Sequence, residues 1–162
     1  MTICQVSYTS RLHAESLTGS PHVAVISITD PGSDDAVLDP AFLDVLRLSF
    51  FDAVPADEYL PAPLPGMFDH LMARRIGDFV GQLHAAPAAI SVVVHCEYGV
   101  SRSAAVALYV SAYAKAPLAA REFAYDANLW VIQQLSRLHP ELTIDIPLEI
   151  GANERRTHPR AD

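Results

Sequence analysis

The sequence predicts a single α/β domain, in which one central, mostly parallel sheet is flanked by helices. Apolar runs rich in β-branched residues alternate along the chain with segments of helical period, a pattern typical of layered α/β folds. Residues 90–95 (ISVVVH) are apolar almost without interruption, as expected of a central strand that is covered on both faces. The length of 162 residues fits one domain with its own hydrophobic core.

Three segments in the first third of the chain have the character of strands. Residues 4–8 give a weak signal, whereas residues 22–28 (HVAVISI) give a strong one and end in a turn signal, Asp-Pro-Gly. Residues 45–50 (VLRLSF) alternate apolar with polar side chains and predict a third strand, although residues 41–46 could instead form a short helical turn. Residues 53–65 contain four prolines and predict a loop.

Helical patterns occupy most of the remaining chain. Apolar side chains at steps of three and four predict an amphipathic helix over residues 66–86. Residues 102–114 are small and apolar nearly all round, which predicts a buried helix. Pro117 predicts the start of a helix over residues 117–125, and Asn128 predicts the cap of a helix over residues 129–138. The domain is expected to cover residues 1–150, and residues 151–162 are expected to form a frayed tail.

The composition restricts the classes of partner. Eleven Lys and Arg against nineteen Asp and Glu give a net charge of −8, which argues against general nucleic-acid binding. The sequence has no basic, apolar leader at its start and no apolar run of about 18 residues, so we expect neither a signal peptide nor a membrane span. Two distant cysteines do not form a disulfide framework. We expect a soluble, cytoplasmic protein, and we favour a monomer.

The segment HCEYGVSRS, residues 95–103, contains the candidate reactive and anion-binding groups. Cys96 ends the predicted buried strand, and Arg102 opens the helix that follows. Backbone N–H groups between them can converge on one point, where the helix N-terminus adds partial positive charge and so favours an anion. Gly99 permits a backbone conformation that a β-carbon would resist. The residues that supply these N–H groups are Glu97, Tyr98, Gly99, Val100 and Ser101.

The two ends of this segment suit phosphate chemistry. The guanidinium of Arg102 can form two parallel hydrogen bonds to a phosphate. A cysteine beside an arginine and a helix N-terminus is held as a thiolate at neutral pH, and Cys96 has both neighbours. A thiolate can attack phosphorus while the arginine and the loop amides stabilise the charge of the transition state. Cys96 could alternatively be a buried structural cysteine.

His-Cys-x5-Arg-Ser is the signature of the cysteine-dependent protein tyrosine phosphatases. The form found here, HCEYGVSRSAAVA, most resembles the small dual-specificity branch and its bacterial relatives. The stretches ISITDP and LRLSFFD, and the helices on either side of the signature, follow the family's order, so the resemblance covers roughly residues 23–138. It implies the α/β fold of these phosphatases and hydrolysis of phosphorylated proteins or small phosphomonoesters, without metal or cofactor.

The resemblance also implies roles for individual residues. Cys96 matches the nucleophile that forms a phosphocysteine, and Arg102 matches the residue that binds the phosphoryl oxygens. Residues 97–101 match the backbone donors of the phosphate-binding loop. Ser103 matches the hydroxyl that assists departure of the thiolate, and His95 matches the residue that orients the loop.

The family takes its general acid from an aspartate on a separate loop upstream. Asp52 follows the predicted strand of residues 45–50 and is the favoured candidate. Asp57, inside the proline-rich loop, is the alternative. Either one could instead be a turn residue that bonds its own backbone. Asp30 also follows a strand and could lie near the rim of the pocket, but we favour a turn role for it.

Other functions fit parts of the pattern. An arsenate reductase related to the low-molecular-weight phosphatases would carry the loop near its N-terminus, whereas Cys96 lies in mid-chain. A sulfurtransferase could use a similar loop, with a cysteine beside backbone N–H groups that bind an anion. A non-catalytic pseudophosphatase would be expected to lack Cys96, Arg102 or the acid. No loop side chain between Cys96 and Arg102 is basic, which disfavours polyphosphorylated inositides as substrates. Cys4 could pair with Cys96 on oxidation.

Overall fold

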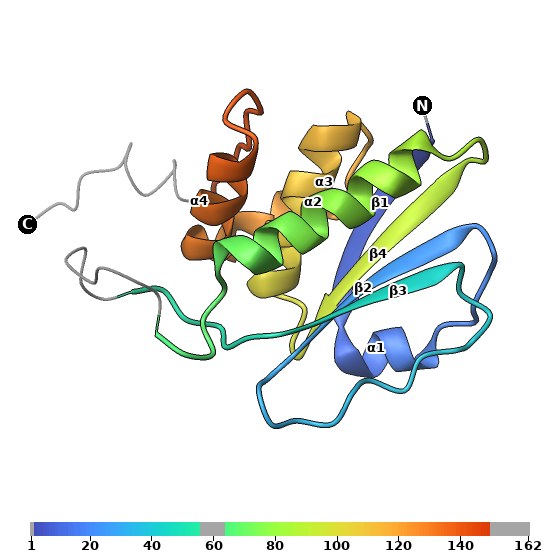
Figure 1. The fold of residues 1–162 in the computed structure, drawn as a ribbon, viewed down its shortest axis with the longest axis horizontal. Coiled ribbons are helices and arrows are strands. Elements are labelled where there is room, and N and C mark those ends of the chain that lie inside the picture. The colour runs from blue at the N-terminus through green and yellow to red at the C-terminus, as the bar shows by residue number, and fades with distance from the viewer. Residues whose placement is uncertain (1, 56–63, 150–162) are drawn as a thin grey trace, which may run out of the picture.

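One parallel sheet forms the centre of the molecule (Figure 1). The structure is a computed structural model that describes residues 2–55 and 64–149. It contains a four-stranded sheet of order β1-β4-β2-β3, and every neighbouring pair of strands is parallel. The predicted α/β class with a single sheet flanked by helices is therefore confirmed. The strands are β1 (Ile3–Ser10), β2 (Val23–Thr29), β3 (Asp44–Ser49) and β4 (Ile90–Cys96).

Helices lie on both sides of this sheet. In Figure 1, α2, α3 and α4 lie together on one side, and the short α1 lies on the other. The strand order explains this, because the chain passes from β1 over β4 to β2 and later returns from β3 over β2 to β4. Right-handed crossovers in opposite directions bring their connections to opposite faces. The helices are α1 (Arg11–Ser16), α2 (His70–Ala85), α3 (Arg102–Ala114) and α4 (Leu129–Leu138), with a 3-10 helix, η1 (Arg121–Asp126), before α4.

β4 is the central strand, as its apolar sequence predicts. It pairs with β1 on one side and with β2 on the other, and Val94 lies between Tyr8 and Ile26. Val92 and Val94 are completely buried. α3 packs on β1 and β4 and is buried along most of its length, as predicted from its small, apolar residues.

The connections that leave β2 and β4 set the position of the site. The two strands are neighbours, but the chain turns from β4 into α3 on one face and from β2 into the α1 side on the other. Neighbouring parallel strands whose connections leave toward opposite faces open a crevice at their carboxyl ends, where ligands bind in sheets of this kind. The segment of residues 95–103 begins at this edge of the sheet, at the carboxyl end of β4 beside β2.

Some predicted boundaries are wrong. α2 begins at His70, later than predicted, because the carboxylate of Asp69 accepts a hydrogen bond from the N–H of Met72 and caps the helix there. The short α1 was not predicted. Residues 41–46 do not form a helical turn, and Asp44 starts β3.

The helix predicted over residues 117–125 is absent, since only Arg121–Asp126 is helical and it is a 3-10 helix. The N–H of Val6 in the edge strand β1 donates to the carbonyl of Pro117, and the N–H of Ala119 donates to the carbonyl of Val6. These backbone bonds make Leu118 an isolated parallel bridge partner of Val6, so the sheet edge, rather than the helical propensity of the segment, decides its conformation. The predicted cap of α4 is confirmed, because the side chain of Asn128 accepts a hydrogen bond from the N–H of Val131.

Within the described parts of the chain, none of the helices has both the length and the apolar character that crossing a bilayer requires. Asp57 and the expected tail of residues 151–162 lie outside these parts.

The two cysteines lie at opposite ends of the sheet. The thiol of Cys4 is 3.4 Å from the carbonyl oxygen of Ile90, the first residue of β4, whereas Cys96 is the last residue of that strand. Seven residues of parallel strand place the two thiols about 20 Å apart. A disulfide requires Cα atoms closer than about 7 Å. The structure therefore contradicts a pairing of Cys4 with Cys96.

We predict that mild oxidation of the folded protein with hydrogen peroxide forms no Cys4–Cys96 disulfide within one chain. The measurement is mass spectrometry of a non-reduced digest, with Cys4→Ser as the matched variant. Cys4→Ser should leave the oxidation rate of Cys96 unchanged. A cross-linked Cys4–Cys96 peptide from monomeric, folded protein would contradict the arrangement of β1 and β4.

Candidate active site

The phosphate-binding loop expected from the sequence, residues 96–102, is called the signature loop below. It leaves the carboxyl end of β4 and enters α3 at Arg102. Its glycine is required for two reasons. Gly99 has a φ of 73°, in the left-handed region. A Cβ at this position would also lie 2.5 Å from the backbone nitrogen of Ser10 and 2.5 Å from the carbonyl carbon of Thr9. The loop therefore packs against the end of β1 in a way that only glycine allows.

Cys96 lies at the base of the signature loop, and its thiol has two hydrogen-bond partners. The side chain is buried, with 2% of the residue exposed. The N–H of Gly99 donates to Sγ at 3.3 Å. Oγ of Ser103, in the first turn of α3, is hydrogen-bonded to the same sulfur at 3.1 Å. The Ser103 hydroxyl accepts from the thiol in this arrangement, and since a hydroxyl can also donate, the same contact suits a sulfur that carries negative charge.

Arg102 is held rigidly at the ends of two other strands. Its Nη1 donates to Oδ1 of Asp30 at 2.6 Å and to the carbonyl oxygen of Phe50 at 2.8 Å. These acceptors directly follow β2 and β3. The residue is only 4% exposed, and its Nε is buried without a hydrogen-bond partner among the described residues. A buried guanidinium donor without a partner is costly, which makes it a ready site for an oxyanion.

His95 orients the start of the signature loop from within the sheet. Its Nε2 lies 2.6 Å from Oγ of Ser27 on β2, and its Nδ1 lies 3.3 Å from the carbonyl oxygen of Cys96. A carbonyl only accepts, so this geometry assigns the proton of the neutral ring to Nδ1 and makes the Ser27 hydroxyl the donor to Nε2. The imidazole thus connects β2 to the backbone of Cys96.

Burial lowers the pKa of His95 below its ordinary value of about 6.5. The positive charges of Arg11 and Arg47 act in the same direction. The carbonyl of Cys96 and the carboxylate of Glu15 oppose this effect without overcoming it. The folded protein therefore favours the neutral ring.

Asp52 is brought to the far end of the signature loop. Its Oδ1 accepts hydrogen bonds from Oγ of Ser101 and from Nδ2 of Asn128, each at 2.8 Å. Nδ2 of Asn128 also donates to the carbonyl of Ala53, at 3.3 Å. Asp52 itself is exposed, whereas Asn128 is buried. The favoured acid is therefore fixed beside the loop by one contact from the loop and one from the start of α4.

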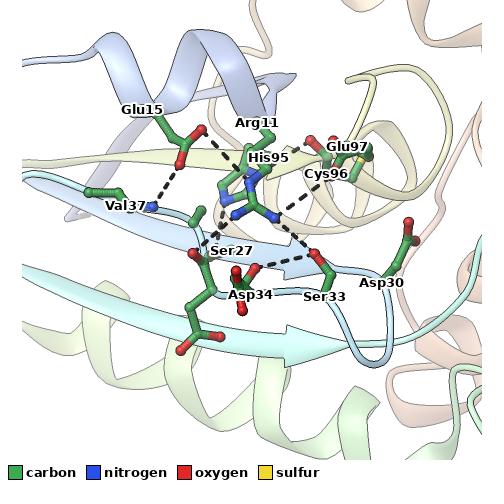
Figure 2. A network of polar contacts seen from close by, with 12 residues as sticks. Arg11, Glu15, Ser27, Asp30, Ser33, Asp34, Val37, His95, Cys96 and Glu97 are labelled. Carbon is green, nitrogen blue, oxygen red and sulfur yellow. Dashed lines mark hydrogen bonds and ion pairs between the residues drawn. The ribbon is translucent and has the colours of Figure 1, made fainter.

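The side chains of the signature loop itself mostly face outward. Tyr98 is 82% exposed and Val100 is 47% exposed. Glu97 is half-buried and lies 3.9 Å from Nη1 of Arg11, in the polar network of Figure 2. The role that the sequence predicts for the backbone N–H groups of these residues stays a prediction.

Two residues at the site have more contacts than the sequence analysis predicted. For Asp30 the sequence favours a turn role over a place near the rim of the pocket. Its carbonyl does accept the N–H of Ser33 in a turn, but its carboxylate pairs with Arg102. Its place directly after β2 was the available signal, since carboxyl ends of parallel strands converge. Asn128 was predicted only as a cap, and nothing in the sequence indicated its contact with Asp52.

No group of three or more His, Cys, Asp and Glu side chains in residues 2–55 and 64–149 converges in a way that could hold a metal ion. Comparison of the sequence with known protein families and with curated proteins gives no match. The evidence on function is therefore the arrangement of Cys96, Arg102 and Asp52 described above.

We predict that His95 makes stability depend on pH near neutrality. The pKa of His95 is lowered on folding, so the unfolded chain binds this proton more readily than the folded protein does. Stability is then complete above about pH 6.5 and falls as the pH decreases, by at most about 1.4 kcal/mol per pH unit, until the folded ring is protonated.

The measurement is the free energy of urea unfolding between about pH 5 and pH 7.5 for wild type, His95→Asn and the exposed-site control His13→Asn. The control should keep the wild-type slope, and His95→Asn should have a shallower one. Equal slopes in all three proteins would show that His95 does not carry this pH dependence.

Proposed function

We propose that this protein hydrolyses phosphomonoesters through a phosphocysteine intermediate, as a member of the cysteine-dependent tyrosine phosphatase superfamily of the dual-specificity type. The observation that carries the proposal is the pairing of two groups at one loop. The thiol of Cys96 accepts from the N–H of Gly99 and donates to the hydroxyl of Ser103 at the base of the loop. The guanidinium of Arg102, whose Nε has no partner among the described residues, belongs to the first residue of the helix that follows. A nucleophile beside a fixed oxyanion donor is what phosphoryl transfer requires.

In the first step, the Cys96 thiolate attacks phosphorus, and an S–P bond forms while the P–O bond to the leaving group breaks. Arg102 and the backbone N–H groups of the loop stabilise the equatorial oxygens as charge develops on them. Asp52 gives a proton to the leaving oxygen. The hydrogen bonds from Ser101 and Asn128 keep its carboxyl group beside the loop.

In the second step, water attacks the phosphocysteine. Asp52, now a carboxylate, takes a proton from that water, the P–S bond breaks, and inorganic phosphate and the thiolate are released. The hydroxyl of Ser103 lies at hydrogen-bond distance from the sulfur and can donate to the thiolate as it departs. Both steps use groups of this chain and water.

The expected substrates are phosphotyrosine in proteins, phosphoserine and phosphothreonine, and small aryl phosphates. The site has one buried cation, Arg102, and it is already paired with Asp30, which suits a single phosphate group better than a polyphosphate. The two cysteines of the described chain are both free thiols. Since the mechanism needs a reduced Cys96, we propose a cytoplasmic location.

We predict that the wild type hydrolyses para-nitrophenyl phosphate in the presence of a metal chelator and that Cys96→Ser abolishes turnover. The reason is that a hydroxyl cannot replace the thiolate as nucleophile at neutral pH. Steady-state release of nitrophenol is the measurement, and Cys4→Ser is the matched control with unchanged activity. Tungstate binding by a well-folded wild type without any turnover would overturn the proposal in favour of a phosphate-binding module.

We predict that Asp52→Asn lowers kcat by up to about 10²–10⁴-fold for phenyl phosphate and by less for para-nitrophenyl phosphate. A poorer leaving group depends more on the proton, so the ratio of the two rates reports general acid catalysis. The basic limb of the pH–rate profile should also disappear. Asp78→Asn, on the exposed face of α2, is the control. If only Asp57→Asn has these effects, the role belongs to Asp57.

A further inference from the structure

We propose that Asp30 is a positioning residue for Arg102, and that Arg11 holds the Asp30 loop in place. The inference rests on the proposed function, because it concerns how that site is prepared for an oxyanion. It is carried by the ion pair between Asp30 and Arg102 and by the polar network around Arg11.

The guanidinium of Arg102 is held by two acceptors on one of its nitrogens. Nη1 of Arg102 is shared between the carboxylate of Asp30 and the carbonyl of Phe50, at 2.6 and 2.8 Å. A guanidinium is planar and rigid, so two acceptors on one nitrogen fix the orientation of the whole group. Nε is left without a partner among the described residues, while the side chain is 5% exposed. The acceptors therefore occupy one end of the guanidinium and leave another donor for a ligand.

The loop that carries Asp30 is held by side chains of α1. Residues 30–43 connect β2 to β3 without a helix or strand, and side chains from elsewhere hold them. Arg11 donates from Nη1 to Oγ of Ser33 and from Nη2 to the carbonyl of Asp35, both at 3.1 Å. Glu15, four residues after Arg11 on α1, accepts the N–H of Val37 at 2.8 Å. Figure 2 shows Arg11 between these groups.

Arg11 also connects the Asp30 loop to the signature loop, which carries Cys96. The backbone N–H of Arg11 donates to the carbonyl of Glu97 at 3.2 Å, and its guanidinium lies 3.9 Å from the Glu97 carboxylate. Glu97 directly follows Cys96. Arg11 thus contacts both the signature loop and the loop of Asp30. One residue fixes the distance between the nucleophile's loop and the partner of Arg102.

Two roles are conceivable for Asp30: it positions Arg102, or it competes with the substrate for the guanidinium. Competition would require the phosphate to displace Asp30 from Nη1. The donor without a partner is Nε, so an oxyanion can bind Arg102 while the ion pair persists. The carboxylate also balances the buried positive charge, and a buried charge that loses its partner is strongly destabilising. The geometry therefore favours positioning.

The test compares Asp30→Ala, Asp30→Asn and the control Asp34→Asn, which removes the same charge from an exposed residue of the same loop. Circular dichroism and thermal melting check the fold. For Asp30→Ala we expect inhibition by tungstate to weaken, and KM for para-nitrophenyl phosphate to rise, by about tenfold or more, with a smaller change in kcat. Asp30→Asn keeps an oxygen acceptor for Nη1 and should recover most of the affinity.

Tighter tungstate binding by Asp30→Ala would overturn the inference and make Asp30 a competitor of the substrate. Unchanged binding by folded Asp30→Ala would overturn it as well. Arg11→Ala should weaken tungstate binding by about threefold and should add little to Asp30→Ala, because both act through one loop. Full additivity would contradict the role of Arg11.

Calorimetric titration of tungstate into Cys96→Ser separates this inference from the proposed function, because binding needs no turnover. If the wild type hydrolyses aryl phosphates and the Asp30 variants bind normally, only the positioning role fails. If no protein hydrolyses them, yet tungstate binding still depends on Asp30, the positioning role stands and the catalytic proposal fails.

Discussion

The place of β4 between β1 and β2 is the constraint on which the rest of the structure depends. Parallel strands bring all their carboxyl ends to one edge, so the residues that follow three strands meet there. Cys96 ends β4, Asp30 follows β2 and Phe50 follows β3. β2 lies between β4 and β3, so the ends of these three strands are neighbours, and Arg102 reaches from the start of α3 to the residues that follow β2 and β3.

Burial has opposite consequences for the two basic groups at this edge. Arg102 remains charged because it cannot lose its proton in a protein, so it requires Asp30 and the Phe50 carbonyl as partners. His95 can lose its proton, and burial lowers its pKa so that it stays neutral and hydrogen-bonded between Ser27 and Cys96. Exclusion of water at the ends of the central strands therefore explains both why Arg102 requires partners and why the His95 ring is neutral.

Several residues at the site also stabilise the fold. Asn128 caps α4 with its side-chain oxygen and holds Asp52 with its side-chain nitrogen. Gly99 allows the signature loop to approach the end of β1 and also donates to the sulfur of Cys96. Arg11 fixes the segment between β2 and β3, which has no helix of its own to cover the sheet. Elements distant in sequence are therefore joined at the site by the bonds that also hold the fold together.

The sequence by itself determined the elements whose signals are local. The apolar run of β4, the small-residue helix α3 and the cap of α4 each depend on neighbouring residues, and all three are confirmed. The tertiary structure decided what depends on distant partners. Leu118 forms a bridge to Val6 because the edge of β1 supplies backbone partners, and Asp30 pairs with Arg102 because β2 lies beside β4. A local pattern records propensity and periodicity, whereas an ion pair between residues 72 apart exists only once the strand order is set.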